Sequence, residues 1–169
     1  MVSCVFPGSF DPVTAGHMHL IKRAAAVFDK VTVAVMVNVH KTGAITVEKR
    51  VDLIRKACKS IPNVNVVSWN GLLANYLREN DEKIVIRGIR SGDEFDQETA
   101  AHYANRILND QIETMFIPAD PGFAGISSSA VREIASFGGN ITPFVPEGLS
   151  EEIFDLLSNK ESIKEKRGK

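Results

Sequence analysis

The stretch Phe6-Pro7-Gly8-Ser9-Phe10-Asp11-Pro12-Val13-Thr14-Ala15-Gly16-His17 decides how the rest of the chain is arranged. It follows a short apolar run, residues 2–5, and precedes apolar residues at helical spacing between residues 21 and 28. A strand, a glycine-bearing turn and a helix in this order aim backbone N–H groups and a positive helix end at an anion. Gly8 and Gly16 lack a Cβ, so a phosphate can approach the main chain. The stretch predicts a nucleotide-phosphate site that His17 faces; the alternative is an ordinary turn with a histidine cap.

The composition is that of one globular domain. The chain has 169 residues, 44% hydrophobic and 24% charged, which is enough to bury a core. A net charge of −1 argues against a general nucleic-acid-binding protein, which would carry a basic face. Cys4 and Cys58 lie in apolar segments without C-x-x-C spacing, so we expect reduced, buried thiols. Without a leader pattern or an apolar run near the ~20 residues of a membrane helix, we expect a cytoplasmic protein with no membrane partner.

Alternating strand and helix patterns predict an α/β fold. The predicted strands are residues 2–5, 31–37, 64–68, 83–86 and 114–117, and the predicted helices are residues 16–28, 46–58, 72–77, 93–108 and 150–157. Helices between successive strands imply right-handed crossovers and a parallel sheet. We therefore predict a Rossmann-like, doubly wound, five-stranded parallel sheet in the order 3-2-1-4-5. Residues 1–158 are expected to form a single domain, and residues 159–169 a charged tail that frays.

Two further segments carry anion-binding chemistry. Arg87-Gly88-Ile89-Arg90 leaves the fourth predicted strand, next to the first in the predicted order, where open parallel sheets bind ligands. Arginines there are costly without an anion, and a guanidinium suits phosphate; the alternative is ion pairs with Asp93, Glu94 or Asp96. Gly125-Ile126-Ser127-Ser128-Ser129-Ala130-Val131-Arg132-Glu133 enters a helix, where hydroxyl and N–H groups can bind phosphate. The alternative is a plain N-cap with Arg132 and Glu133 in solvent.

Thr14-Ala15-Gly16-His17 resembles the T/H-x-G-H motif of the nucleotidyltransferase superfamily, and residues 7–12 narrow the resemblance to the phosphopantetheine adenylyltransferases. With residues 87–90 and 126–129 in the expected order, the resemblance extends from Val5 to about Pro146. It implies reversible transfer of the adenylyl group from ATP to 4′-phosphopantetheine, which gives dephospho-coenzyme A and pyrophosphate in coenzyme A biosynthesis. It also implies a homohexamer, and Mg²⁺ held mainly by the phosphates of ATP.

The resemblance implies a role for each matching residue. Catalysis would use His17, Lys41 and Arg90. Contacts with ATP would come from Ser9, Phe10, His17, Gly88, Ile89, Arg90, Glu98, Phe123, Ala124, Gly125, Ile126, Ser127, Ser128 and Ser129. Contacts with 4′-phosphopantetheine would come from Ser9, Lys41, Leu73 and Arg87, although a core-facing helix would explain Leu73 equally well. The chain departs from the family pattern at Phe6, Ile45, Gln97 and Gly125.

Nucleotidyl transfer needs no covalent intermediate, because a phosphate oxygen of the acceptor attacks directly and pyrophosphate leaves. Alignment of the two substrates and stabilisation of charge on the phosphorus can supply the catalysis. Both the neutral and the protonated form of His17 fit this role. Two alternatives stay open. One is a nucleotidyltransferase that uses nicotinate mononucleotide or, with CTP, glycerol phosphate; the other is a module that binds a nucleotide or coenzyme A without turnover.

Overall fold

The structure, a computed structural model, describes the backbone of residues 1–37 and 42–167 and the side chains of residues 1–37 and 42–158. Within these ranges, strands alternate with helices along the chain. The strands are β1 (Ser3–Gly8), β2 (Lys30–Val37), β3 (Val64–Asn70), β4 (Ile84–Ile89) and β5 (Glu113–Pro118). The helices are α1 (Ala15–Ala25), α2 (Val47–Ala57), α3 (Leu73–Glu79), α4 (Gly92–Leu108), α5 (Ser128–Ser136) and α6 (Ser150–Arg167), with 3-10 turns η1 (Pro121–Phe123) and η2 (Thr142–Phe144).

The strands form one sheet in the order β3-β2-β1-β4-β5, and every neighbouring pair is parallel. The predicted α/β class and strand order are therefore confirmed. The order reverses between β1 and β4, which pair at Val5 and Val85. The loops that leave these two strands consequently emerge side by side at one edge of the sheet.

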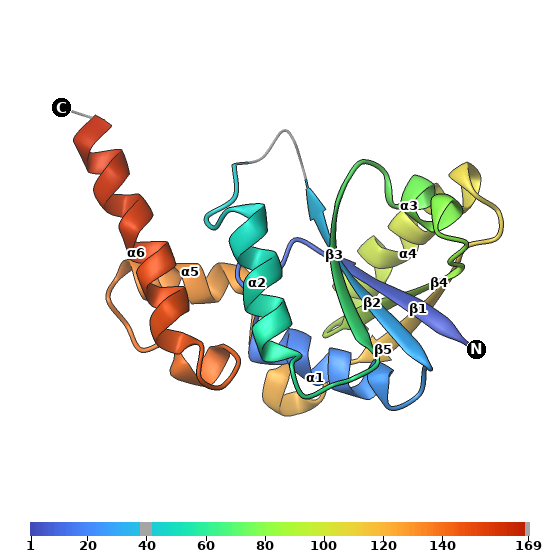
Figure 1. Cartoon of the computed structure of the whole chain (residues 1–169), viewed down its shortest axis with the longest axis horizontal. Coiled ribbons are helices and arrows are strands. Elements are labelled where there is room, and N and C mark those ends of the chain that lie inside the picture. The colour runs from blue at the N-terminus through green and yellow to red at the C-terminus, as the bar shows by residue number, and fades with distance from the viewer. Residues whose placement is uncertain (38–41, 168–169) are drawn as a thin grey trace.

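Helices cover both faces of the sheet (Figure 1). On one face, α1, α2, α5 and α6 contribute to the larger apolar cluster, with Ile21, Ile54, Val131 and Ile153 fully buried. On the other face, Ala74 and Leu77 of α3 pack against Val5 and other strand residues. The β-branched, almost wholly apolar β2 is buried along most of its length, as expected for a central parallel strand. Helix α4 differs from the others because it contains no buried residue.

Several predicted boundaries were wrong. β4 continues to Ile89, so Arg87, Gly88 and Ile89 pair within the sheet, and α1 ends at Ala25 rather than at residue 28. β1 continues to Gly8, because Phe6 is buried and pairs with Val33; the first three residues of the quoted stretch therefore belong to the strand rather than to the turn. α6 continues to Arg167 rather than ending near residue 157, since Glu, Lys and Arg, which are frequent in residues 159–167, are good helix formers. Fraying of residues 159–169 stays a prediction.

None of the helices in the described ranges combines the length and apolar character that a membrane crossing needs.

Candidate active site

A reciprocal cap at the start of α1 fixes the ring of His17. The backbone N–H of His17 donates to Oγ1 of Thr14 at 3.2 Å, and the backbone N–H of Thr14 donates to Nδ1 of His17 at 3.1 Å. Nδ1 is therefore an acceptor, so the neutral imidazole carries its proton on Nε2. The cap satisfies two groups at the helix N-terminus and leaves Nε2–H as the donor of the ring.

The surroundings of His17 favour its neutral form. Burial, followed by the positive charges of Arg90 and Arg87, lowers the pKa of His17 from 6.5 to about 4. The Phe10 ring and the imidazole pack in an edge-to-face arrangement, with ring centroids 4.9 Å apart. At pH 7 the residue is a neutral hydrogen-bond donor, and an anion bound beside it would raise this pKa.

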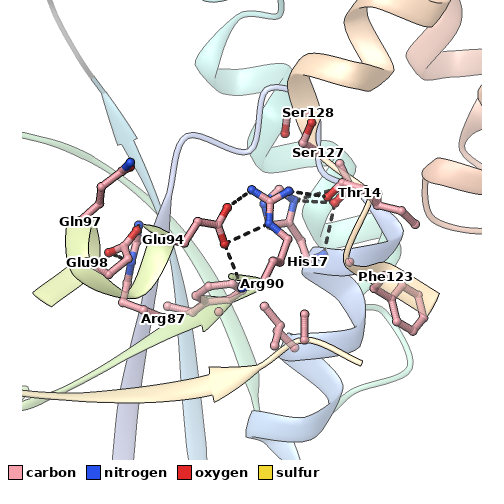
Figure 2. Close-up of a pocket in the computed structure, with 16 residues that line it drawn as sticks. Thr14, His17, Arg87, Arg90, Glu94, Gln97, Glu98, Phe123, Ser127 and Ser128 are labelled. Atoms are coloured by element: carbon pink, nitrogen blue, oxygen red, sulfur yellow. Dashed lines mark hydrogen bonds and ion pairs between the residues drawn. The ribbon is translucent and has the colours of Figure 1, made fainter. Parts of the chain in front are cut away.

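His17 and Arg90 line the same cavity, of about 260 Å³ (Figure 2). The walls come from the end of β1, the first turns of α1, the end of β4, the start of α4 and the N-terminus of α5. Fold topology and local sequence thus bring the three predicted anion-binding segments together. Nine of the predicted site residues line this cavity: His17, Arg87, Gly88, Arg90, Glu98, Phe123, Ile126, Ser127 and Ser128.

Both arginines are paired with glutamates of α4. The guanidinium of Arg90 donates to the carboxylate of Glu94, and its Nη1 donates to the carbonyl of Ile126 at 3.2 Å. Arg87 donates through Nε to Glu98 at 2.6 Å and through Nη1 to the carbonyl of Pro7 at 2.7 Å. Of the ion pairs that the sequence allowed with Asp93, Glu94 or Asp96, the one between Arg90 and Glu94 is therefore present. Each guanidinium has five N–H groups, so these described partners leave donors with which a phosphate could pair.

The N-terminus of α5 is tied to the turn after β1. Oγ of Ser127 caps the helix by accepting from the N–H of Ala130 at 3.1 Å. Oγ of Ser128 donates to the carbonyl of Pro12 at 2.7 Å, and Nη1 of Arg132 donates to the carbonyl of Asp11 at 2.5 Å. The alternative that Arg132 is only a solvent charge is wrong. These bonds hold the positive end of α5 beside the turn before α1.

Two apolar contacts shape the walls of the cavity. A Cβ built at Gly88 would lie 2.2 Å from Cδ1 of Leu20, so with any larger residue at position 88 the Leu20 side chain or α1 would have to move. The ring of Phe123 stacks on the ring of His19, with centroids 4.4 Å apart and planes 16° from parallel. The carboxylate of Asp120 lies 3.1 Å from Nε2 of His19. The loop before α5 is thereby packed on α1.

The other predicted site residues are not in the lining of this cavity: Ser9, Phe10, Ile89, Leu73, Ala124, Gly125 and Ser129. Lys41 lies outside the described residues. Leu73 is partly buried and packs against the cluster on the α3 face of the sheet. The sequence analysis did not propose Leu20 and Ala119, which do line the cavity. Leu20 follows His17 by three residues, so helical periodicity could have placed both on one face.

Comparison with known proteins gives a consistent result. The sequence profile of the cytidylyltransferase-like family matches residues 5–134. The chain is 44% identical over 155 residues to a phosphopantetheine adenylyltransferase of Clostridium perfringens, covering 92% of this chain and 94% of that protein. It is 43% identical over 156 residues to the protein of that name from Finegoldia magna, covering 92% and 96%. The phosphopantetheine adenylyltransferase of Dictyoglomus turgidum is 42% identical over 160 residues, covering 95% and 100%.

A solved structure supports the fold alone. It is a crystal structure of a Vibrio parahaemolyticus protein assigned as a nicotinate-nucleotide adenylyltransferase. The TM-score is 0.67 over 94% of this chain and 93% of that one, with 18% sequence identity.

Proposed function

The chain belongs to the cytidylyltransferase-like family and, within it, to the phosphopantetheine adenylyltransferases, and from this premise we propose that it transfers the adenylyl group of ATP to 4′-phosphopantetheine. The products are dephospho-coenzyme A and pyrophosphate, in a step of coenzyme A biosynthesis. The observation that carries the proposal is the meeting of His17, Arg90 and the N-terminus of α5 in one cavity. Together these groups offer a hydrogen-bond donor, a positive charge and helix N–H groups to one chain of phosphates.

The reaction is a direct displacement at the α-phosphorus of ATP. A phosphate oxygen of the acceptor forms the new P–O bond, and the bond between the α-phosphorus and the bridging oxygen to the β-phosphorus breaks, with its electron pair leaving on pyrophosphate. The Nε2–H of neutral His17 would donate to an α-phosphate oxygen as its negative charge grows. Arg90 and the α5 N-terminus would stabilise the same charge and the leaving phosphates. Lys41, outside the described residues, is proposed to add a further positive charge.

Binding of the acceptor is proposed to use the other side of the same cavity. Arg87 would bind the phosphate of 4′-phosphopantetheine, and Glu98 would hold its guanidinium in place from α4. Gly88 to Arg90 would face ATP. The phosphate of 4′-phosphopantetheine and the α-phosphate of ATP would therefore meet at the end of β4, between Arg87 and the residues that follow it. This arrangement aligns nucleophile and electrophile without a covalent intermediate.

Mg²⁺ is proposed to enter with ATP. Among the described residues, no group of three or more His, Cys, Asp or Glu side chains could hold a metal ion. The carboxylates in the cavity, Glu94 and Glu98, already accept from arginines. This donor set fits an ion that is coordinated by phosphates and water, as Mg²⁺ usually is. When bound, the ion neutralises phosphate charge on the leaving group.

The experiment that tests the function compares acceptors under identical conditions. Pyrophosphate release is measured with ATP plus 4′-phosphopantetheine, ATP plus nicotinate mononucleotide, and CTP plus glycerol phosphate. We expect turnover with the first pair and a kcat/KM at least ~10²-fold lower with the others, as expected where a site must pair with the polar groups of its own substrate. Preference for another pair would reassign the acceptor. Tight ATP binding without pyrophosphate release from any pair would favour the non-catalytic module.

We also propose a homohexamer whose contacts include the outer face of α4. This helix exposes Phe95, Tyr103, Ile107 and Leu108, and Met115 of β5 is exposed as well. An exposed apolar patch of this kind is typical of a protein–protein contact. Light scattering after gel filtration should give six times the chain mass, and Tyr103→Glu with Ile107→Glu should give smaller species. A wild-type chain that elutes as a monomer would contradict the hexamer.

A cytoplasmic location is proposed on the state of the thiols. Cys4 and Cys58 are buried and unpaired, and burial raises their pKa values to about 12 and about 11. Reduced, unreactive thiols of this kind are typical of a reducing compartment.

A further inference from the structure

The turn between β1 and α1 contains a backbone conformation that needs support. Phe10 has a φ of 47°, in the left-handed region that bulky side chains rarely adopt. Its side chain is 1% exposed, so the residue is also fixed by packing. Strained residues persist only where their surroundings hold them, and they cluster at functional sites. The question is therefore which groups hold Phe10 and what its position controls.

Polar side chains from two helices hold the residues on either side of Phe10. Nη1 of Arg50, in α2, donates to the carbonyl of Ser9 at 2.9 Å. The carboxylate of Asp11 accepts from the N–H groups of Ala44 and Ile45 at 2.7 and 2.8 Å. From α5, Arg132 donates to the carbonyl of Asp11. The peptide before Phe10 and the residue after it are thus both fixed by buried or partly buried groups.

Arg50 is an unusual choice for its position. It shares the inward face of α2 with Val51 and Ile54 and is only 7% exposed. Its Nε is buried and has no hydrogen-bond partner among the described residues. An incompletely paired buried guanidinium is unfavourable for stability, and an apolar side chain would fill the same position more cheaply. Because this arrangement is unfavourable for stability, we expect Arg50 to have a role other than packing. The hydrogen bond from Arg50 to the carbonyl of Ser9 indicates that this role is to hold the turn.

The ring of Phe10 connects the turn to His17. It packs edge to face with the imidazole and with the ring of Phe6, with ring centroids 4.9 and 5.5 Å apart. A relaxation of the Ser9–Phe10 peptide toward negative φ would move this ring and remove its contact with the imidazole, which would then be oriented by the Thr14 cap alone. We infer that Arg50 is a positioning residue, which holds the strained Ser9–Phe10 turn so that Phe10 keeps His17 aligned in the cavity. The kinetic part of this inference rests on the proposed adenylyl transfer; the structural part does not.

Arg50→Lys tests the inference, with Arg55→Lys as its matched control. Arg55 lies in the same helix and also donates from its guanidinium to a backbone carbonyl, that of Val66 at 3.1 Å, away from the cavity. We expect Arg50→Lys to lower kcat about 10- to 100-fold, since displacements near 1 Å cost this much in an aligned site. The change in KM for ATP should be smaller than the change in kcat. Arg55→Lys should keep kcat within about 2-fold, because its contact is remote from the aligned groups.

A second readout does not depend on turnover. The ¹⁵N chemical shifts of the His17 imidazole, recorded on the full chain at pH 7, report its tautomer and surroundings. They should change in Arg50→Lys and stay at the wild-type values in Arg55→Lys. His17→Asn identifies the signals. If the His17 chemical shifts in a folded Arg50→Lys protein equal those of the wild type, the inference is overturned, whatever the activity of the variant. If the wild-type protein turns over none of the acceptor pairs, the proposed function is overturned instead.

Gly43→Ala provides a variant that keeps Arg50 intact. A Cβ at residue 43 would lie 2.8 Å from Nη2 of Arg50 and 3.1 Å from both Oδ2 of Asp11 and the carbonyl oxygen of Ile45, so the end of the Arg50 side chain, the Asp11 carboxylate or both must shift. The substitution should reproduce the altered His17 shifts and the loss in kcat, in the same direction as Arg50→Lys. Should Arg50→Lys fail to fold, Gly43→Ala decides: unchanged His17 shifts and kcat would overturn the inference.

Discussion

Replacement of Gly88 by alanine tests the packing that brings β4 and α1 together at the cavity. The new Cβ would lie 2.2 Å from Cδ1 of Leu20 and 3.5 Å from its Cγ. Real Cβ contacts do not reach 2.2 Å, so α1 or the Leu20 side chain must move. Leu20 is buried and lines the cavity, so a movement of its side chain changes the packing at the cavity wall. Overpacking of this kind costs about 1–3 kcal/mol, and for a chain of this size it corresponds to a fall in Tm of roughly 2–12 °C.

The same clash predicts a coupling that can be measured. Leu20→Ala removes all three atoms that the new methyl group meets, Cγ, Cδ1 and Cδ2, at a cost of about 2–5 kcal/mol for the cavity that it leaves. In the Leu20→Ala background, Gly88→Ala should therefore cost about 1 kcal/mol or less, giving a coupling energy of about 1–2 kcal/mol. Urea denaturation of the wild type, the two single variants and the double variant gives these values.

Gly92→Ala is the matched control. Gly92 is the first residue of α4, and a Cβ built there meets nothing within 4 Å. The same substitution should therefore be neutral or stabilise the fold by up to about 1 kcal/mol, because alanine restricts the unfolded chain. An equal loss of stability from Gly88→Ala in both backgrounds, or a loss no larger than that of Gly92→Ala, would refute the packing argument.

Two further predictions concern His17. His17→Ala should lower kcat by at least ~10²-fold with a smaller effect on the binding of ATP, because it removes a donor to charge that develops in the transition state; unchanged turnover in steady-state kinetics would remove His17 from the mechanism. The lowered pKa also predicts how stability depends on pH. Since the folded-state pKa of about 4 lies below the reference value of 6.5, the unfolded chain binds the proton more strongly between these values, and the free energy of unfolding should fall as pH drops through this window. In His17→Asn this fall should be smaller, as measured by urea denaturation at several pH values; parallel curves for both proteins would contradict the shift.

The sheet could be predicted from the sequence because the strand and helix patterns alternate regularly along the chain. Apolar, β-branched runs alternate with amphipathic helices, and the handedness of parallel crossovers leaves few arrangements for such a chain. The edge between β1 and β4 was predicted for the same reason, together with the polar strand exits that meet there. The ends of elements were less predictable: Phe6 lies in β1 and pairs with Val33 of β2, and α6 continues to Arg167.

The partners of charged residues could not be predicted from spacing alone. Glu98 matched a residue type expected at ATP, yet its carboxylate accepts from Arg87. In one alternative, Arg132 was expected to be exposed to solvent. Its guanidinium instead donates to the carbonyl of Asp11, in a segment far away in the sequence. The resemblance implied a contact of Gly88 with ATP, and the close approach of Leu20 to Gly88 could not be predicted from the sequence. Such contacts depend on tertiary packing.

One feature of the sequence, a charged residue on the apolar face of α2, indicates a buried polar contact that the sequence analysis did not propose. Arg50 lies at helical spacing with Val47, Val51 and Ile54, so a charge was visible on an otherwise apolar face of α2. A charge in that place calls for a buried partner, which the structure provides in the carbonyl of Ser9.

The most direct measurement of the central claim is a crystal structure with 4′-phosphopantetheine and a non-hydrolysable ATP analogue. We expect Nε2 of His17 and the guanidinium of Arg90 to donate to the phosphates of the same ATP molecule, with the β- and γ-phosphates at the N-terminus of α5. The acceptor phosphate should lie in line with the bond that breaks. Phosphates bound elsewhere, or His17 and Arg90 contacting different ligands, would contradict the account.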